Sequence, residues 1–266
     1  MEGSSKPDPA RPKTQDPRLP KTAVLTGASA GIGAAAAHAL AGAGFHLILG
    51  ARRLDRLREV AEPIGATALE LDVTDAASVA AFAARLPSEV HLLVNNAGVG
   101  HGLDRIADAR DEDWLGMWQT NVLGVLRLTR ALLPALRASG DGHIINLGSV
   151  AGFETYVGGA GYTGTKHAVR AFTRTLRLEL LGEPVRITEI DPGLVETEFS
   201  LVRFAGDAER AKAVYRGYQP LTAEDVADCI VWAATRPSHV NIDEIVVRPR
   251  DQATASLVHR RDPAKP

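Results

Sequence analysis

The chain has 266 residues, of which 45% are apolar and 23% charged, and its formal net charge is −2. This balance gives no general attraction to nucleic acid or to a membrane surface, so neither is expected as a partner. The single cysteine excludes an intrachain disulfide, the scattered histidines offer no metal-ligand spacing, and a cytoplasmic protein is expected.

Residues 1–20 carry five prolines among charges of both signs. That composition cannot build a packed core, so a disordered N-terminal extension is expected there. Residues 21–250 form the expected domain, and residues 251–266 are interpreted as a C-terminal tail.

Short apolar runs alternate with helix-like segments after Pro20. The apolar runs predict strands at 23–25, 45–49, 68–71, 92–94, 143–147, 185–190 and 241–247. The segments between them predict helices at 31–43, 54–64, 78–86, 111–137, 161–181 and 223–234, the last with Thr222 as N-cap. This alternation indicates α/β architecture: one doubly wound, Rossmann-type domain whose seven-stranded parallel sheet has helices on both faces.

A glycine-rich segment, residues 26–33, follows the first predicted strand and opens a helix. A helix N-terminus offers free N–H groups and a positive dipole end, and glycines let a diphosphate approach the backbone closely. The alternative is a turn needed only for tight packing. The expected dinucleotide contacts here are Gly27, Ser29, Ala30, Gly31, Ile32 and Gly33.

The end of the second predicted strand bears on the choice of cofactor. A carboxylate at this position would bind the ribose hydroxyls of NAD, but the chain has Arg52 and Arg53 instead. Arginine suits a 2′-phosphate, so NADP(H) is expected, with Arg52 as the main contact and Arg53 as the second. The alternative for Arg53 is the solvated face of the next helix.

Two further strand ends carry candidate cofactor contacts. Asp72 is expected to accept from the adenine amino group, with Val73 against the ring, although Asp72 also suits a helix N-cap. The two consecutive amides of Asn95-Asn96-Ala97-Gly98 are expected to hold backbone groups and to line the cofactor floor, with Asn95, Ala97 and Gly98 as cofactor contacts. A structural turn is compatible with this role.

Tyr162 and Lys166 stand four residues apart in a helix-like segment and so share one helical face. The phenol of tyrosine has an ordinary pKa near ~10, and a neighbouring lysine cation lowers it. Tyr162 is therefore expected to exchange a proton with the substrate, while Lys166 lowers its pKa and holds the ribose hydroxyls. A surface charge is the alternative for Lys166.

Two more polar residues complete the expected reaction centre. Ser149 precedes Tyr162 by thirteen residues and is expected to donate to a substrate carbonyl oxygen, with a helix cap as the alternative. Asn121 lies inside a predicted helix and is expected to hold a water linked to Lys166, or else to be a satisfied buried amide. Together with the glycine segment, these residues indicate hydride transfer between a nicotinamide and a carbonyl or alcohol.

With these motifs in this order, the chain resembles the short-chain dehydrogenases/reductases over essentially its whole length after the extension. The resemblance implies a catalytic tetrad of Asn121, Ser149, Tyr162 and Lys166. It also implies cofactor binding by Gly27, Gly31, Gly33 and Asn95, with Pro192, Gly193, Val195 and Thr197 beside the nicotinamide.

Residues 191–204, 221–227 and 239–242 look like those of the NADP-dependent 3-hydroxy acid and serine dehydrogenase subgroup. This narrower resemblance implies a homotetramer that acts on small hydroxy acids such as serine, allo-threonine or 3-hydroxypropionate. Arg203 is the candidate for binding the substrate carboxylate, with a surface salt bridge to Asp207 or Glu209 as the alternative. No metal site is expected.

Two other functions compete with this interpretation. One is an NADPH-dependent reductase of aldehydes or ketones in secondary metabolism, which shares the chemistry and differs in the pocket. The other is an NADP(H)-binding regulator without turnover. The complete set of Ser149, Tyr162 and Lys166 argues against the regulator, because a sensor needs no proton donor.

Overall fold

The structure is a computed structural model that describes residues 20–261. The expected disordered extension, apart from Pro20, and residues 262–266 of the expected tail lie outside these residues. Seven parallel strands form one sheet in the order β3-β2-β1-β4-β5-β6-β7, which confirms the predicted doubly wound fold. The strands are β1 (Thr22–Thr26), β2 (His46–Ala51), β3 (Thr67–Glu70), β4 (Leu92–Asn95), β5 (Gly142–Leu147), β6 (Val185–Pro192) and β7 (Glu244–Val247).

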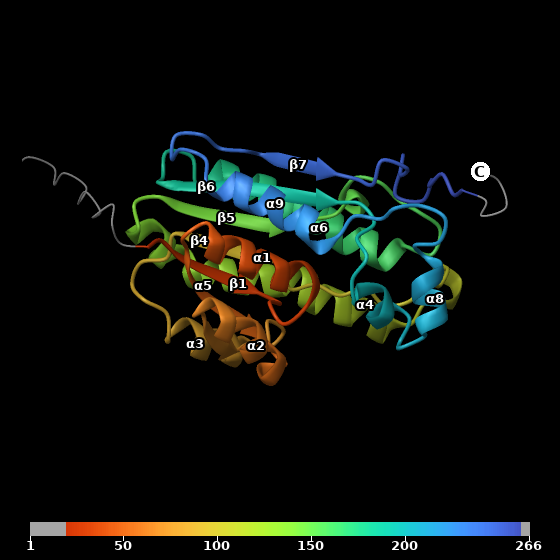
Figure 1. Ribbon diagram of the computed structural model, residues 1–266, viewed down its shortest axis with the longest axis horizontal. Helices are drawn as coiled ribbons and strands as arrows, with labels where there is room; N and C mark the ends of the chain where they lie inside the picture. The colour runs from red at the N-terminus through yellow and green to blue at the C-terminus, as the bar shows by residue number, and fades with distance from the viewer. Residues whose placement is uncertain (1–19, 262–266) are drawn as a thin grey trace, which may run out of the picture.

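Helices cover both faces of the sheet (Figure 1). One face packs against α1, α2 and α9, and the other against α3, α5 and α6. Every residue of β5 and β6 is buried, as expected for strands covered on both sides. The helices are α1 (Gly31–Gly42), α2 (Leu54–Ala61), α3 (Ala76–Ala83), α4 (Asp111–Trp118), α5 (Val125–Ala138), α6 (Ala160–Glu179), α7 (Phe199–Arg203), α8 (Ala208–Ala213) and α9 (Ala223–Ala234).

The predicted helix at 111–137 is divided into α4 and α5 by a π-helical segment, Gln119–Gly124. A π-helical turn interrupts the regular hydrogen-bond ladder of an α-helix, and such turns often lie at functional sites. This segment contains Asn121, whose side chain is buried. The apolar periodicity of residues 111–137 therefore predicted the helical region correctly, but periodicity cannot show where the hydrogen-bond pattern changes locally.

The last strand is shorter than predicted, because it begins at Glu244 and not at residue 241. The side chain of Asn241 replaces the missing backbone pairing: its Oδ1 accepts from the Ile187 amide at 2.8 Å, and its Nδ2 donates to the Ile187 carbonyl at 3.0 Å. The predicted N-cap of α9 is confirmed, because Thr222 and Asp225 form a reciprocal capping box.

The strand order changes direction between β1 and β4. From β1 the chain continues through β2 and β3 toward one edge of the sheet, and from β4 it continues through β5, β6 and β7 toward the other. Ligands in open α/β sheets bind at such a switch point, beyond the carboxyl ends of the strands. The short helices α7 and α8, absent from the sequence-based prediction, follow β6 at this end. Figure 1 shows α4 and α8 at the end toward which the strand arrows point. Within residues 20–261, no helix combines the length and apolarity needed to cross a bilayer.

Candidate active site

A cavity of about 590 Å³ lies along the carboxyl ends of the strands and reaches α7. It brings together residues that are far apart in sequence, including both predicted hydroxyl groups of the reaction centre. Gly33, Asn95 and Asn121 do not line it. The predicted residues that do are Gly27, Ser29, Ala30, Gly31, Ile32, Arg52, Arg53, Asp72, Val73, Ala97, Gly98, Ser149, Tyr162, Lys166, Pro192, Gly193, Val195, Thr197 and Arg203.

The glycine turn is held tightly against the end of β4. Gly27 has φ +65°, and a Cβ atom on it would lie 2.9 Å from the Ala97 Cα, so both conformation and space require glycine. A Cβ on Gly33 would lie 2.4 Å from the Gly27 carbonyl oxygen. Gly33 therefore serves helix–turn packing, the alternative interpretation of this motif, while Gly27 and Gly31 face the cavity.

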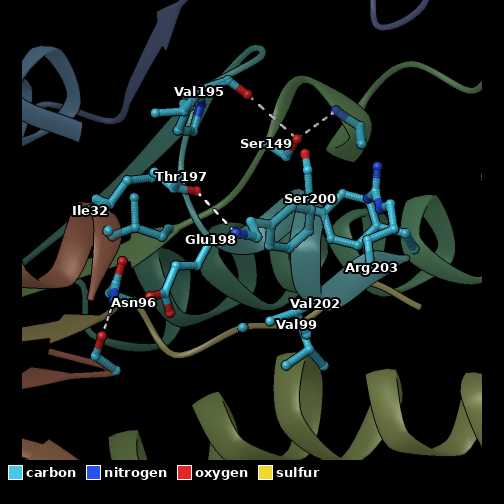
Figure 2. Close-up of a pocket in the computed structure, with 18 of the residues that line it drawn as sticks. Ile32, Asn96, Val99, Ser149, Val195, Thr197, Glu198, Ser200, Val202 and Arg203 are labelled. Carbon is cyan, nitrogen blue, oxygen red and sulfur yellow. Dashed lines mark hydrogen bonds between the residues drawn. The ribbon is translucent and has the colours of Figure 1, made fainter. Parts of the chain in front are cut away.

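Asn96, one of the two consecutive amides expected to hold backbone groups, fastens this turn. Its Nδ2 donates to the Thr26 carbonyl at 2.8 Å and to the Gly27 carbonyl at 3.2 Å, and its side chain lines the cavity. Figure 2 shows Asn96 on the same side of the pocket as Ile32. Asn96 thus links the ends of β1 and β4 and fixes the backbone that a diphosphate would meet.

Asn95 faces the protein interior, contrary to its expected cofactor contact. Its Nδ2 donates to the Asn146 Oδ1 at 2.8 Å and to the Thr129 Oγ1 at 3.1 Å, and Asn146 donates to Thr173. Asn95 is 3% exposed. Asn95, the last residue of β4, thus joins the strand to the buried layer, while Asn96, just beyond the strand, lines the cavity.

The two arginines after β2 have different surroundings. Arg53 donates to the Ser29 Oγ from Nε and Nη2, at 3.3 and 3.2 Å, and pairs with Glu198 at 3.0 Å. Arg52 lines the same part of the cavity and makes no ion pair with any of residues 20–261. An unpaired guanidinium at the strand end fits a 2′-phosphate better than a neutral ribose hydroxyl.

Asp72 forms a local turn and does not cap α3, whose N-cap is Asp75. Its Oδ1 accepts from the amide and the hydroxyl of Thr74, at 2.9 and 2.7 Å. Burial acts to raise the pKa of the Asp72 carboxyl, but the two Thr74 hydrogen bonds and the charge of Arg52 together lower it. A fixed, ionised carboxylate at the cavity wall suits an adenine amino group.

Helix α6 presents Tyr162 and Lys166 to the cavity on one face, as their spacing predicted. The Lys166 ammonium lies 5.8 Å from the centre of the Tyr162 ring and donates to the Leu147 carbonyl at 2.7 Å. Burial lowers the pKa of Lys166 to about 8, against the opposing charges of Glu189 and Asp191. Lys166 is thus a buried, anchored cation, which excludes the surface-charge alternative.

Burial also raises the pKa of the Tyr162 phenol. The positive charge of Arg203 opposes this rise most strongly, and a hydrogen bond with the Ser149 hydroxyl also lowers the pKa of Tyr162. Lys166 was expected to have this effect, but the Arg203 guanidinium lies closer to the ring, at 4.8 Å from its centre. The sequence spacing identified one cation on the helix but not a second one brought in by α7.

Ser149 lies between β5 and α6 in the chain and is 7% exposed. Its Oγ accepts from the Ala151 amide at 3.1 Å, so the residue caps a short turn as well as facing the cavity. Its own amide donates to the Asp191 Oδ1 at 2.7 Å. These contacts hold the Ser149 hydroxyl on the cavity wall (Figure 2), and Tyr162 lines the same cavity.

Arg203 does not form either of the salt bridges considered as its alternative role. Asp207 caps α8, and Glu209 pairs with Lys212 and Arg216. The Arg203 guanidinium instead stacks on the rings of Tyr162 and Phe199, each at 4.8 Å, and its buried Nε has no hydrogen-bond partner among residues 20–261. A buried donor beside the reaction centre needs an acceptor, and a ligand can supply one.

Asn121 acts on the backbone, which matches its alternative interpretation as a satisfied buried amide. Its Oδ1 accepts from the Val99 amide and its Nδ2 donates to the Val99 carbonyl, both at 2.8 Å. The Nδ2 also donates to the Thr165 Oγ1 at 3.1 Å. Asn121 therefore ties the segment after β4 to helix α6.

Residues 251–261, assigned to a tail, complete the cavity wall. The Gln252 Oε1 accepts from the Leu194 amide at 2.8 Å, and Glu154 binds both Arg248 and the Ala255 amide. Ala255, Ser256, Val258 and Arg260 line the cavity together with the aromatic residues Tyr156, Phe199 and Tyr215. Of these, only Phe199 belongs to a stretch that carried the subgroup resemblance, residues 191–204.

The fold and the arrangement of the site identify the protein family to which the chain belongs. The family described as short chain dehydrogenase matches residues 21–206, and the chain belongs to this family. Individual relatives extend the likeness over most of the chain.

An uncharacterized oxidoreductase of Mycobacterium tuberculosis strain H37Rv is 61% identical over 236 residues, covering 89% of this chain and 94% of that protein. An NADP-dependent 3-hydroxy acid dehydrogenase of Schizosaccharomyces pombe is 43% identical, covering 91% of this chain and 97% of that protein. The closed form of a serine dehydrogenase complexed with NADP+ superimposes with a TM-score of 0.86 at 41% identity, covering 90% of this chain and 100% of that one.

Proposed function

We propose that this protein is an NADP(H)-dependent oxidoreductase that interconverts the alcohol of a small 3-hydroxy acid and the corresponding carbonyl. The observation that carries the substrate class is Arg203, whose guanidinium lies on the Tyr162 ring with a buried, unpartnered Nε. A substrate carboxylate bound by Arg203 would place its nearby hydroxyl beside Tyr162 and Ser149. The names of the 3-hydroxy acid and serine dehydrogenase relatives support this assignment.

The cofactor assignment rests on the cavity end formed by β1 and β2. Gly27 and Gly31 leave room for a diphosphate, Asp72 suits the adenine, and Arg52 suits a 2′-phosphate. Pro192, Gly193, Val195 and Thr197 line the opposite part, where the family resemblance places the nicotinamide. NADP(H), when bound, accepts or supplies the hydride.

The chain's own residues handle the proton and the oxygen. Ser149 donates a hydrogen bond to the substrate oxygen and so stabilises its developing negative charge. Tyr162 removes the hydroxyl proton during oxidation and returns it during reduction. The Arg203 charge favours the phenolate form of Tyr162, and the Lys166 cation, held by the Leu147 carbonyl, is placed to bind ribose hydroxyls.

A reductase of neutral aldehydes or ketones is the second candidate, and the apolar part of the wall favours it. Leu103, Val202 and Phe199 line the cavity beside Tyr162, a surface suited to a larger, less polar substrate. The chemistry at Ser149 and Tyr162 would be the same. The two candidate functions differ in whether Arg203 binds a substrate carboxylate.

A substrate panel tests the proposal directly. Purified protein should oxidise L-serine, allo-threonine or 3-hydroxypropionate with NADP+ and reduce malonic semialdehyde with NADPH, followed at the NADPH absorbance. NADH and NAD+ in parallel should be at least about tenfold poorer, because they leave Arg52 without a phosphate. Turnover confined to neutral carbonyls would favour the reductase, and equal use of NADH would contradict the cofactor assignment.

We further propose that the protein is a homotetramer, as the subgroup resemblance implies. Trp114, Leu115 and Trp118 on α4 and Leu126 on α5 expose large apolar surfaces, which is typical of an interface. Light scattering coupled to size exclusion should give four times the chain mass, and Trp118→Glu should lower it. A monomeric mass at micromolar concentration would contradict this assembly.

A further inference from the structure

One carboxylate bridges two arginines at the edge of the expected phosphate site. Glu198 pairs with the Arg53 Nη1 through Oε2 and with the Arg56 Nη1 through Oε1, both at 3.0 Å. Arg53 and Glu198 line the cavity, whereas Arg56 lies about one helical turn after Arg53 on α2 and does not line it. The charges of Arg53 and Arg56, with their hydrogen bonds, lower the pKa of Glu198, so it is ionised at neutral pH.

The remaining donors of Arg53 point back to the glycine turn. Its Nε and Nη2 donate to the Ser29 hydroxyl, so the guanidinium is fixed between the diphosphate turn and Glu198. Arg52, in contrast, has no ion pair with residues 20–261. The phosphate site therefore contains one available guanidinium and one already engaged by a carboxylate of the chain.

Glu198 faces the cofactor end and not the reaction centre. It stands directly before α7, which carries Arg203 at its other end. In Figure 2 the Glu198 carboxylate extends to the side of Ile32 and Asn96, while Arg203 extends to the opposite side. A change at Glu198 can thus alter the phosphate site without removing a group that contacts the substrate.

We propose that Glu198 competes with the 2′-phosphate of NADP(H) for Arg53 and Arg56, and so limits the preference of this protein for NADPH over NADH. This inference rests on the proposed NADP(H) dependence. A carboxylate and a phosphate both accept from arginine, and each N–H that serves Glu198 is withheld from the cofactor. Without Glu198 the phosphate would meet Arg52 and Arg53 with neither of them in an ion pair with residues 20–261, and Arg56 would lie one helical turn away.

The test is the dissociation constant of ligands for Glu198→Gln, measured by fluorescence or calorimetry without turnover. The Glu198 side chain makes no capping hydrogen bond to α7, so glutamine keeps the helix start intact. NADPH and adenosine 2′,5′-bisphosphate should bind about three- to tenfold more tightly, the range of an exposed ion pair with two partners, and NADH should be unchanged. Salt at about 0.5 M should reduce the gain.

Glu196→Gln is the matched control, because it removes the same charge two residues earlier, on an exposed side chain that pairs with no arginine within residues 20–261. It should shift each constant less than about twofold. Unchanged or weaker NADPH binding by Glu198→Gln overturns the inference, as does a loss confined to NADH, which would place Glu198 on the ribose hydroxyls. If the parent protein fails to bind the bisphosphate, the NADP(H) assignment fails and this inference falls with it.

Discussion

Replacing Tyr162 by phenylalanine should lower kcat by about a thousandfold while changing the dissociation constant of NADPH less than about twofold. The variant removes one oxygen and leaves the ring, which packs edge-on against Phe199 with centroids 5.5 Å apart. Arg203 can still stack on the ring. The lost step is therefore proton exchange with the substrate, and the cavity keeps its shape.

Tyr218→Phe provides the matched control, since burial also raises the pKa of this tyrosine and its side chain does not line the cavity. It should keep kcat within about fivefold of the parent value. Single-turnover rates and NADPH fluorescence titrations separate the chemical step from binding. If Tyr162→Phe retains a tenth or more of the parent kcat, Tyr162 is not the proton donor.

Local signals explain why much of this site was predictable. The glycine turn and the Tyr162–Lys166 pair are defined by spacing within a few residues, and spacing maps directly onto a turn and a helix face. The seven strands and the main helices follow from apolar periodicity for the same reason. Errors at their ends arise where a side chain replaces the backbone, as Asn241 does beside β6.

Non-local contacts explain the rest. Asn95 and Asn96 are chemically identical neighbours, but Asn95 is the last residue of β4 and binds Asn146, whereas Asn96 follows the strand and reaches the glycine turn. The cation facing Tyr162 comes from α7, 41 residues beyond it in the chain. Gln252 and Ala255 reach the wall through contacts with Leu194 and Glu154, which no local pattern indicates.

Replacing Arg203 by alanine should lower kcat/KM for the reduction of a carbonyl that carries a carboxylate, such as malonic semialdehyde, by about a hundred- to a thousandfold, mainly through KM, because an arginine–carboxylate pair in an enclosed site is lost. Reduction of a neutral aldehyde should change by less than about fivefold. The Arg203 charge lowers the pKa of Tyr162, so its removal leaves the phenol more fully protonated and ready to donate.

Arg210→Ala is the control for a stacked arginine, since its guanidinium lies 4.5 Å from the centre of the Phe204 ring on the neighbouring helix and it does not line the cavity. It should leave both activities near the parent values. Arg203→Lys keeps the charge but not the planar pair of donors, so its KM for the acid should lie between the values of the parent and of Arg203→Ala. Equal losses on acids and neutral aldehydes would mean that Arg203 supports Tyr162 alone, and the proposed substrate class would lose its structural basis.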